Sequence, residues 1–326
     1  LNSITSLTNK GVTNAIIQKN IDFEPHLKDI TIFFSDIRGF TLISDGFNKV
    51  YGDKSAAEII SFLNDYMSRM VNCITITGGI VDKFEGDAIM ASWGVLRDDN
   101  LDYEMLPDSN SQKRLLKKEH EKNIRQDALN SIKSTLAMRY ALMEYNKAAF
   151  EFSRLHENDL DVKYKPQIRI GAGINSGRAT VGFMEKKEKM EFTSIGDAVN
   201  LASRTESSNK PCGTDILITQ NTLYLLRDYV RADFNNYHIS DENKINEIIV
   251  EKIPATFEVK GKGVQHFYGV VNMPNFDIEK FFKQGEASFK ADPDCIKAVG
   301  PTGPKTLDEV RVMLGIPIPE FEKVDL

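Results

Sequence analysis

The sequence predicts an α+β fold in which an extended mixed β-sheet is flanked by helices. Four of the five residues at positions 30–34 are apolar and β-branched or aromatic, which is typical of a buried strand. Two further apolar runs meet at Glu85-Gly86-Asp87, a hairpin signal. Helical periodicity precedes and follows this hairpin. The resulting order β–α–α–β–β–α–β predicts a ferredoxin-like core, with an antiparallel-rich sheet, helices on one side, and later elements extending it.

The first strand ends in a carboxylate. Asp36 follows the apolar run, and Gly39 comes three residues later. An ionised carboxylate at the end of a buried strand is costly unless it is paired, and a bound cation is one such partner. A turn at Gly39 allows backbone N–H groups to approach a phosphate. The alternative is a lone Asp that caps the next turn.

A second carboxylate, Asp87, stands at the start of the second hairpin strand. If the hairpin pairs beside the first strand, Asp36 and Asp87 meet at one point. Mg²⁺ is usually held by one or two carboxylates, with substrate phosphates completing its coordination. The pair therefore indicates a divalent-cation site.

Two helices are expected around the hairpin. A capping-box pattern at residues 55–58 precedes apolar residues at helical spacing, and Gly78 suits the end of that helix. Residues 97–123 are charged and read as an irregular surface insertion, with His120 exposed. A long amphipathic helix is expected from about Ile124.

The second half of the sequence offers basic and amide side chains. Residues 167–175 and 178–183 read as paired strands around Asn175-Ser176-Gly177. A helix from Gly196-Asp197 places Asn200 and Arg204 on one face, since they are four residues apart. Lys260 lies where a strand runs into a Gly-rich turn. A solvated surface charge is the alternative reading for both basic residues.

Composition excludes some classes of function. The chain of 326 residues has a net charge of −6, so no basic footprint indicates nucleic acid. No apolar run approaches the ~20 residues that span a bilayer. The three cysteines lack metal-ligand spacing and predict reduced thiols in a cytoplasmic compartment. The start at Leu1 is interpreted as that of an excised region, for which the cytosolic domain of a membrane protein is one origin.

The sequence resembles the class III nucleotidyl cyclases, in particular the bacterial homodimeric adenylate cyclase type. Five segments carry the resemblance in the family's order: FFSDIRGFT (33–41), GGIVDKFEGDAIMASWG (78–94), IRIGAGINSGRATVG (168–182), FTSIGDAVNLASRTE (192–206) and FEVKGKG (257–263). The resemblance implies a connector from an upstream region at 1–27 and a catalytic domain at 28–274. Residues 275–326 are left as an extension of unknown role.

The resemblance implies conversion of ATP to 3′,5′-cyclic AMP and pyrophosphate. Asp36 and Asp87 would hold two Mg²⁺ or Mn²⁺ ions, together with the backbone of Ile37. The turn that contacts the triphosphate would comprise Gly39, Phe40 and Thr41.

The remaining family positions would bind the ribose, the triphosphate and the base of the nucleotide. Asn200 would orient the ribose and Arg204 would stabilise the transition state, while Lys260 would bind the triphosphate. Lys83 and Thr193 would read the base, and Lys83, a donor only, suits the acceptor N1 of adenine. ATP is therefore expected over GTP.

The metal-binding carboxylates and the residues that would bind the base, ribose and triphosphate together imply a homodimer. An extended ATP cannot place its base end and its metal end on the same short hairpin, so one chain would supply the carboxylates and the other chain the rest. Two other readings stay open, a guanylate cyclase and a non-catalytic regulatory nucleotide-binding module. A domain that joins two triphosphates is disfavoured, because Gly78-Gly79 is followed by Ile80 rather than by that group's acidic loop.

Overall fold

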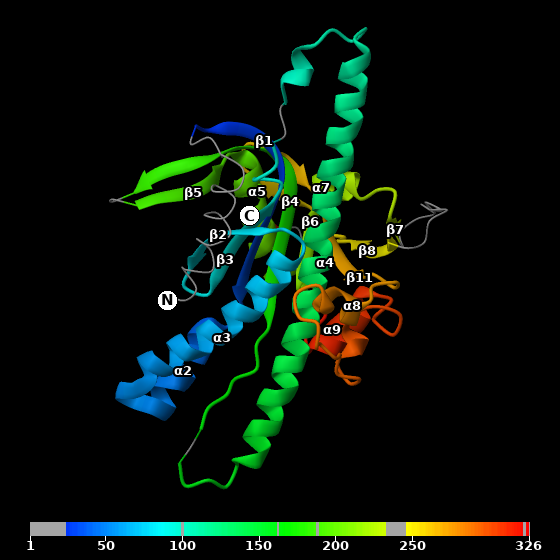
Figure 1. The fold of residues 1–326 in the computed structure, drawn as a ribbon. Helices are drawn as coiled ribbons and strands as arrows, with labels where there is room; N and C mark the ends of the chain where they lie inside the picture. Colours follow the sequence, from blue (N-terminus) through cyan, green and yellow to red (C-terminus); the bar gives the residue numbers. More distant parts are fainter. Residues whose placement is uncertain are drawn as a thin grey trace.

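The computed structural model describes residues 24–98, 101–161, 163–186, 189–232, 246–321 and 324–325. Most of the expected connector, residues 1–23, lies outside the described part. The core elements follow the expected order: β1 (His26–Ile37), α2 (Phe40–Tyr51), α3 (Ser55–Ile76), β2 (Ile80–Glu85), β3 (Ala88–Trp93), α4 (Ser111–Leu155) and β4 (Ile170–Lys186). The predicted βααββαβ core is thus confirmed (Figure 1).

Further elements extend this core. The helical ones are α5 (Asp197–Ser207), α6 (Asn209–Cys212), α7 (Gln220–Leu225), α8 (Ile278–Lys283) and α9 (Leu307–Leu314). The strands are β5 (Lys189–Ile195), β6 (Ile216–Thr219), β7 (Val230–Ala232), β8 (Ile248–Lys252), β9 (Phe257–Val259), β10 (Gly263–Gln265), β11 (Phe267–Asn272) and β12 (Val324–Asp325). The main sheet has the order β2-β3-β1-β4-β6-β11-β8-β7, and β5 pairs with β4. A small second sheet has the order β10-β9-β12.

Strand β1 lies inside the main sheet, between β3 and β4. It pairs antiparallel with β3 on one side, where Ser35 is opposite Ile89. It pairs antiparallel with β4 on the other side, where Asp36 is opposite Gly171. The expected pairing of the hairpin beside the first strand is therefore confirmed.

The two faces of β1 pack against different helices. Phe33 is fully buried in the main hydrophobic cluster, together with side chains of α3 and α4. Its neighbour Ile32, which points to the opposite face, is buried in a second cluster that includes Ala202 of α5. The core helices α3 and α4 thus share one face of the sheet, and α5 covers the other (Figure 1).

The expectation of an irregular insertion up to residue 123 was wrong. Helix α4 begins at Ser111, where the Asn110 side chain accepts hydrogen bonds from the amides of Gln112 and Lys113. The helix is 45 residues long and extends past the sheet at both ends (Figure 1). His120 is buried rather than exposed, and its Nε2 lies 2.7 Å from Asp29 Oδ2. The many charges of this segment are therefore those of a projecting helix.

The expected break in β4 at residues 175–177 is also absent. The strand is continuous because its central polar side chains find partners within the sheet. Ser176 Oγ lies 2.8 Å from Thr31 Oγ1, and Asn175 Oδ1 accepts a 2.6 Å hydrogen bond from Thr219. Polar residues of this kind usually indicate a turn. Here they are buried in a strand, and their side chains are hydrogen-bonded to neighbouring strands.

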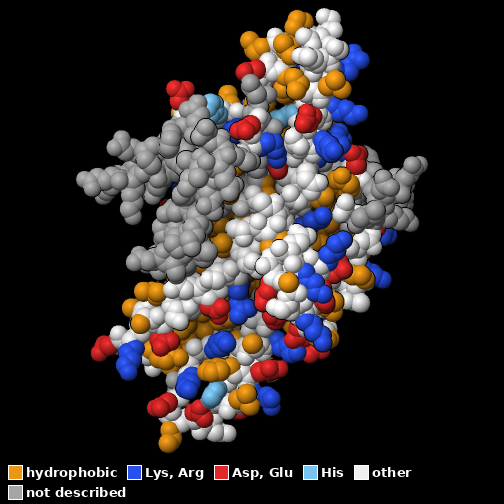
Figure 2. Space-filling view, in the orientation of Figure 1, with side chains coloured by type: hydrophobic (Ala, Val, Ile, Leu, Met, Phe, Trp, Pro, Cys, Tyr) orange, Lys and Arg blue, Asp and Glu red, His pale blue; other side chains and the backbone are white. Residues whose placement is uncertain are grey.

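The C-terminal segment, residues 275–321, packs onto the domain. Phe276, Phe281 and Phe282 join the main hydrophobic cluster, while Leu307 and Val310 of α9 are buried against the small-sheet side. In the described part of the chain, no helix is long and apolar enough to cross a membrane. On the face drawn in Figure 2, basic and acidic side chains are interspersed without a continuous basic stripe.

Candidate active site

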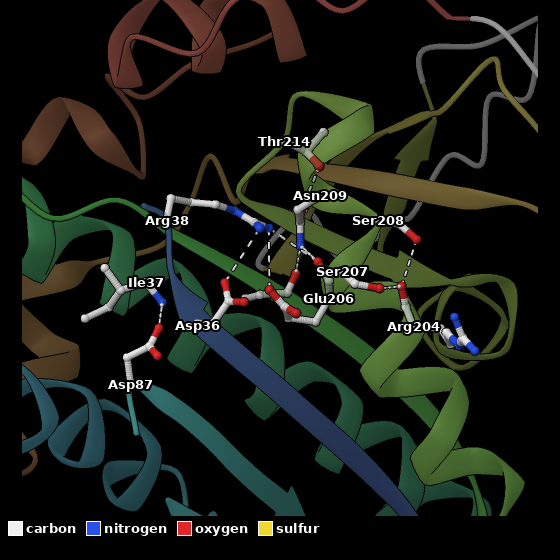
Figure 3. A network of polar contacts seen from close by, with 11 residues as sticks. Asp36, Ile37, Arg38, Asp87, Arg204, Glu206, Ser207, Ser208, Asn209 and Thr214 are labelled. Atoms are coloured by element: carbon white, nitrogen blue, oxygen red, sulfur yellow. Dashed lines mark hydrogen bonds and ion pairs between the residues drawn. The ribbon is translucent and has the colours of Figure 1, made fainter. Parts of the chain in front are cut away.

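Asp36 and Asp87 meet at the end of β1, as expected. The amide of Ile37 donates a 2.9 Å hydrogen bond to Asp87 Oδ2 (Figure 3). A tight turn delivers Asp87 to this point, with Gly86 at a φ of 60° that favours glycine. Burial raises the pKa of Asp87, and the nearby Asp36 carboxylate raises it further. Two acidic groups are thus held close to each other at the C-terminal end of β1.

The Asp36 carboxylate has an unsatisfied oxygen. Its Oδ1 is buried without a hydrogen-bond partner, and the closest basic atom, Arg38 Nη1, is 3.6 Å away. A buried carboxylate oxygen without a partner, beside a second carboxylate, fits the oxygen ligands that Mg²⁺ and Mn²⁺ prefer. Within the described residues no third acidic, His or Cys side chain completes a protein-only metal cluster. The pair therefore fits a cation that shares its coordination with a substrate.

The turn after β1 presents backbone to the same place. Gly39 has a φ of 65° and is the N-cap of α2, so the helix begins at Phe40. Thr41 follows in the first turn and is exposed, while Phe40 packs partly against the core. The N-terminus of a helix carries unpaired N–H groups and a partial positive charge, which suit a phosphate group.

Glu206 is a site residue that sequence reasoning missed. It lies on α5, is buried, and faces Arg38, whose Nη2 is 3.5 Å from Glu206 Oε1. Burial raises the pKa of Glu206 to about 8, with a further contribution from Asp36. The spacing of residues along α5 could have indicated Glu206. Glu206 is four residues after the buried Ala202, so it falls on the apolar face of the helix.

Arg169 is a second residue that the sequence did not reveal. Its carbonyl accepts a 2.7 Å hydrogen bond from the amide of Arg38, which places it beside the β1–α2 turn. Its exposed side chain donates to the carbonyl of Gly315 at 2.9 Å and lines a cavity that also reaches Gly39. An arginine just before a strand resembles any surface charge, so only the strand register identifies its neighbours.

The second expected set lies away from the carboxylate pair within one chain. Asn200 and Arg204 are exposed on α5, and Figure 3 shows the Arg204 guanidinium pointing away from Asp36. Lys260 is exposed at the β9–β10 turn. The neighbouring Lys262 forms a 3.2 Å ion pair with Asp197, the first residue of α5. The β9–β10 turn therefore reaches the start of α5, the helix that carries Asn200 and Arg204.

The expected base-reading residues lie on strands that touch. Lys83 is exposed on β2, Thr193 is half-buried on β5, and these two strands contact each other. Asp82, adjacent to Lys83, accepts 3.2 Å hydrogen bonds from Ser92, and burial raises its pKa to about 7. A carboxyl group with a raised pKa is therefore the immediate neighbour of Lys83 in β2.

The family model "Adenylate and Guanylate cyclase catalytic domain" matches residues 23–270 of the chain. The chain belongs to this family. The match covers the predicted catalytic domain, residues 28–274, almost from end to end and stops where the C-terminal segment begins. The cyclase domain thus contains the carboxylate pair, the α2 turn and α5.

Two curated relatives of the cyclase domain are named adenylate cyclases. One, "Adenylate cyclase, terminal-differentiation specific" of Dictyostelium discoideum, is 35% identical over 196 residues, which cover 60% of this chain and 7% of that protein. Another, "Adenylate cyclase" of Anabaena cylindrica, is 31% identical over 194 residues, 60% of this chain and 30% of that protein. The chain therefore spans less than a third of either relative.

Solved structures share the fold. The guanylyl cyclase Cya2 is 26% identical, with a TM-score of 0.50, and the match covers 76% of this chain and 94% of that one. A bacterial light-regulated adenylyl cyclase is 19% identical with a TM-score of 0.53, covering 87% of this chain and 67% of that one. The second likeness concerns the fold alone.

Proposed function

We propose that this domain converts ATP to 3′,5′-cyclic AMP and pyrophosphate, and so supplies an intracellular signal. The observation that carries the proposal is the meeting of Asp36 and Asp87 beside the N-terminus of α2, in a domain of the cyclase family. In the reaction the ribose 3′-oxygen attacks the α-phosphorus while pyrophosphate leaves. Such chemistry depends mainly on positioning and on stabilisation of charge.

Asp36 and Asp87 would hold two Mg²⁺ or Mn²⁺ ions, with the Ile37 backbone alongside them. The unsatisfied Oδ1 of Asp36 supports this assignment, because a cation would satisfy it. When bound, such ions lower the pKa of the attacking hydroxyl group and neutralise charge on the triphosphate. The Gly39–Thr41 turn would position the phosphates through its backbone N–H groups, and Arg169 would add a charged donor beside them.

The active site would form between two copies of the chain. Asn200 would orient the ribose of the nucleotide bound by the partner's carboxylates, and Arg204 would stabilise its transition state. The outward direction of Arg204 within one chain supports a shared site (Figure 3). Both sets occur in this sequence, so a C₂ homodimer would hold two equivalent sites.

Lys83 and Thr193 would select adenine. Lys83 donates to the acceptor N1 of adenine, whereas guanine presents a donor at that position. The adenylate cyclase names of the curated relatives support ATP as the substrate. The likeness to the guanylyl cyclase Cya2 favours GTP as the second candidate.

Turnover of isotope-labelled ATP and GTP, with Mg²⁺ and with Mn²⁺, tests the proposal. We expect cyclic AMP from ATP at a rate well above that of cyclic GMP from GTP. Arg204→Ala should fold and lose about 10²–10³-fold in turnover, as when one preorganised charge-stabilising donor is removed. Nucleotide binding without any cyclic product would instead indicate the regulatory module, and equal rates would indicate a domain without base selection.

A further inference from the structure

The C-terminal segment walls a cavity beside the candidate phosphate turn. The cavity has a volume of about 770 Å³ and reaches Arg38 and Gly39 at the end of β1. Its other walls are α2, the C-terminal half of α4, the residues before β4, and the segment around Lys297 and Leu314. Residues beyond the family match, which ends at 270, therefore complete this cavity.

The charge of the lining is predominantly basic. Four basic side chains and one acidic side chain line the cavity: Arg38, Lys147, Arg169, Lys297 and Asp294. Lys147 is occupied, since its Nζ lies 2.8 Å from Asp294 Oδ2 and 3.0 Å from Asp292 Oδ2. Arg38 faces Asp36 and Glu206. Among the described residues no carboxylate pairs with Arg169 or Lys297, so their charge is available to a bound anion.

The C-terminal segment also holds Arg169 in place. Arg169 Nη1 donates a 2.9 Å hydrogen bond to the carbonyl of Gly315, which ends α9 at a φ of 70°. A guanidinium group has five N–H donors, so this bond leaves others free. Helix α9 is itself fixed, because Arg311 is buried and donates 2.9 Å hydrogen bonds to the carbonyls of Cys212 and Gly213. Gly315 is therefore a rigid support for Arg169.

We propose that the C-terminal segment is part of the catalytic unit and that this cavity takes the pyrophosphate group. Lys297 would contact that group directly, and Gly315 would act as a positioning residue through Arg169. The inference rests on the proposed function. As the 3′-oxygen passes its proton to water and forms a bond to the α-phosphorus, the bond from that phosphorus to the bridging oxygen breaks. Pyrophosphate leaves with the electron pair of that bond, and divalent ions held by Asp36 and Asp87 would stabilise its charge.

Direct binding of magnesium pyrophosphate, measured by calorimetry on the intact chain, tests the cavity without turnover. Lys297→Ala should weaken this binding about tenfold, which corresponds to roughly 1.4 kcal/mol. Lys297→Arg should keep most of the affinity. Lys290→Ala removes an exposed lysine of the same segment outside the cavity and should leave the affinity unchanged. Equal affinities in wild type and Lys297→Ala would overturn the proposal.

A double-mutant cycle tests the role of Gly315. Gly315→Val strains a backbone that requires a positive φ and should displace the carbonyl that holds Arg169. Both Gly315→Val and Arg169→Ala should weaken pyrophosphate binding, and the double variant should be no weaker than Arg169→Ala. Additive losses would show that Gly315 acts only on stability, which thermal unfolding of each variant measures separately.

The assays separate this inference from the proposed function. Pyrophosphate binding that depends on Lys297, in a wild-type chain that makes no cyclic nucleotide, would support the cavity and contradict the cyclase assignment. Cyclic AMP formation with the same pyrophosphate inhibition in wild type and Lys297→Ala would support the enzyme and contradict the cavity. If the cyclase assignment and the pyrophosphate cavity are both correct, Lys297→Ala should weaken inhibition of turnover by pyrophosphate. The fold-change should match the loss of affinity in direct binding.

Discussion

Arg38 Nη2 lies 3.5 Å from Glu206 Oε1, and this pair joins the end of β1 to α5 (Figure 3). The same guanidinium lies 3.6 Å from Asp36 Oδ1. Helix α5 carries Asn200 and Arg204 on its exposed side, so one arginine connects the carboxylate end of the chain to the helix that would serve the partner's site. The position of α5 therefore depends on groups next to the candidate metal ligands.

Arg38→Ala should destabilise the fold by about 1–3 kcal/mol, the range for loss of charged hydrogen-bond partners at partly buried sites. Asp36 and Glu206 would then face each other without a cation between them. Urea unfolding in EDTA measures the effect without divalent ions. Arg69→Ala, which breaks an exposed pair with Asp65, is the control and should cost less than about 1 kcal/mol. Equal losses in the two variants would contradict a special role for Arg38.

Gly171→Ala should displace the Arg38 guanidinium. A Cβ at position 171 would lie 1.8 Å from Arg38 Nη2, and the flexible end of that side chain is the group that must move. We expect a loss of stability similar to that of Arg38→Ala. In an Arg38→Ala background the same substitution should cost little, because the clash is gone. A Gly171→Ala loss that is the same in both backgrounds would place its cause elsewhere.

Asp82→Asn should flatten the dependence of stability on pH. Burial raises the pKa of Asp82 from 3.8 to about 7, so its contribution to stability is full below about pH 4 and is lost as pH rises through 7. The unfolding free energy of wild type minus that of Asp82→Asn should therefore fall between about pH 4 and pH 7 and level off above pH 7. Glu206 titrates in both proteins and cancels in this difference. If the unfolding free energies of the two proteins changed with pH in parallel, the raised pKa of Asp82 would be contradicted.

Asp29→Asn should loosen the projecting half of α4. Burial alone would raise the pKa of Asp29, but hydrogen bonds from His120 and Arg178 outweigh it and lower that pKa to about 2. The stability that Asp29 contributes is therefore present above pH 3.8 and lost as pH falls through 2. At neutral pH, hydrogen exchange should rise in residues 111–123 and stay unchanged in α3. Unaltered exchange near His120 would show that this contact does not hold the helix.

The core could be predicted because short sequence patterns determine its strands and turns. The apolar run before Asp36 and the Gly86 turn before Asp87 are enough to set two strands and to bring two carboxylates together. Local patterns failed where long-range contacts decide the structure. The turn-like residues Asn175 and Ser176 become strand because Thr219 and Thr31 bond to them from neighbouring strands.

The same reasoning explains which parts of the site were missed. Glu206 and Arg169 acquire their surroundings from the register of β4 and from the packing of α5, neither of which a short sequence window contains. The role proposed for residues 275–321 was equally hidden, because Lys297 and Gly315 come near the β1–α2 turn and Arg169 only through the packing of the C-terminal segment. Their sequence carries no motif that marks a phosphate.

The measurement that tests the shared active site most directly is complementation between two inactive variants. Asp87→Ala lacks one carboxylate, and Arg204→Ala lacks the guanidinium that would act across the interface. When the two are mixed in equal amounts, half of the dimers should be mixed, and each of these should keep one intact site. We predict recovery of roughly a quarter of wild-type cyclic AMP formation. No recovery, with mixed dimers shown to form, would contradict a site built from two chains.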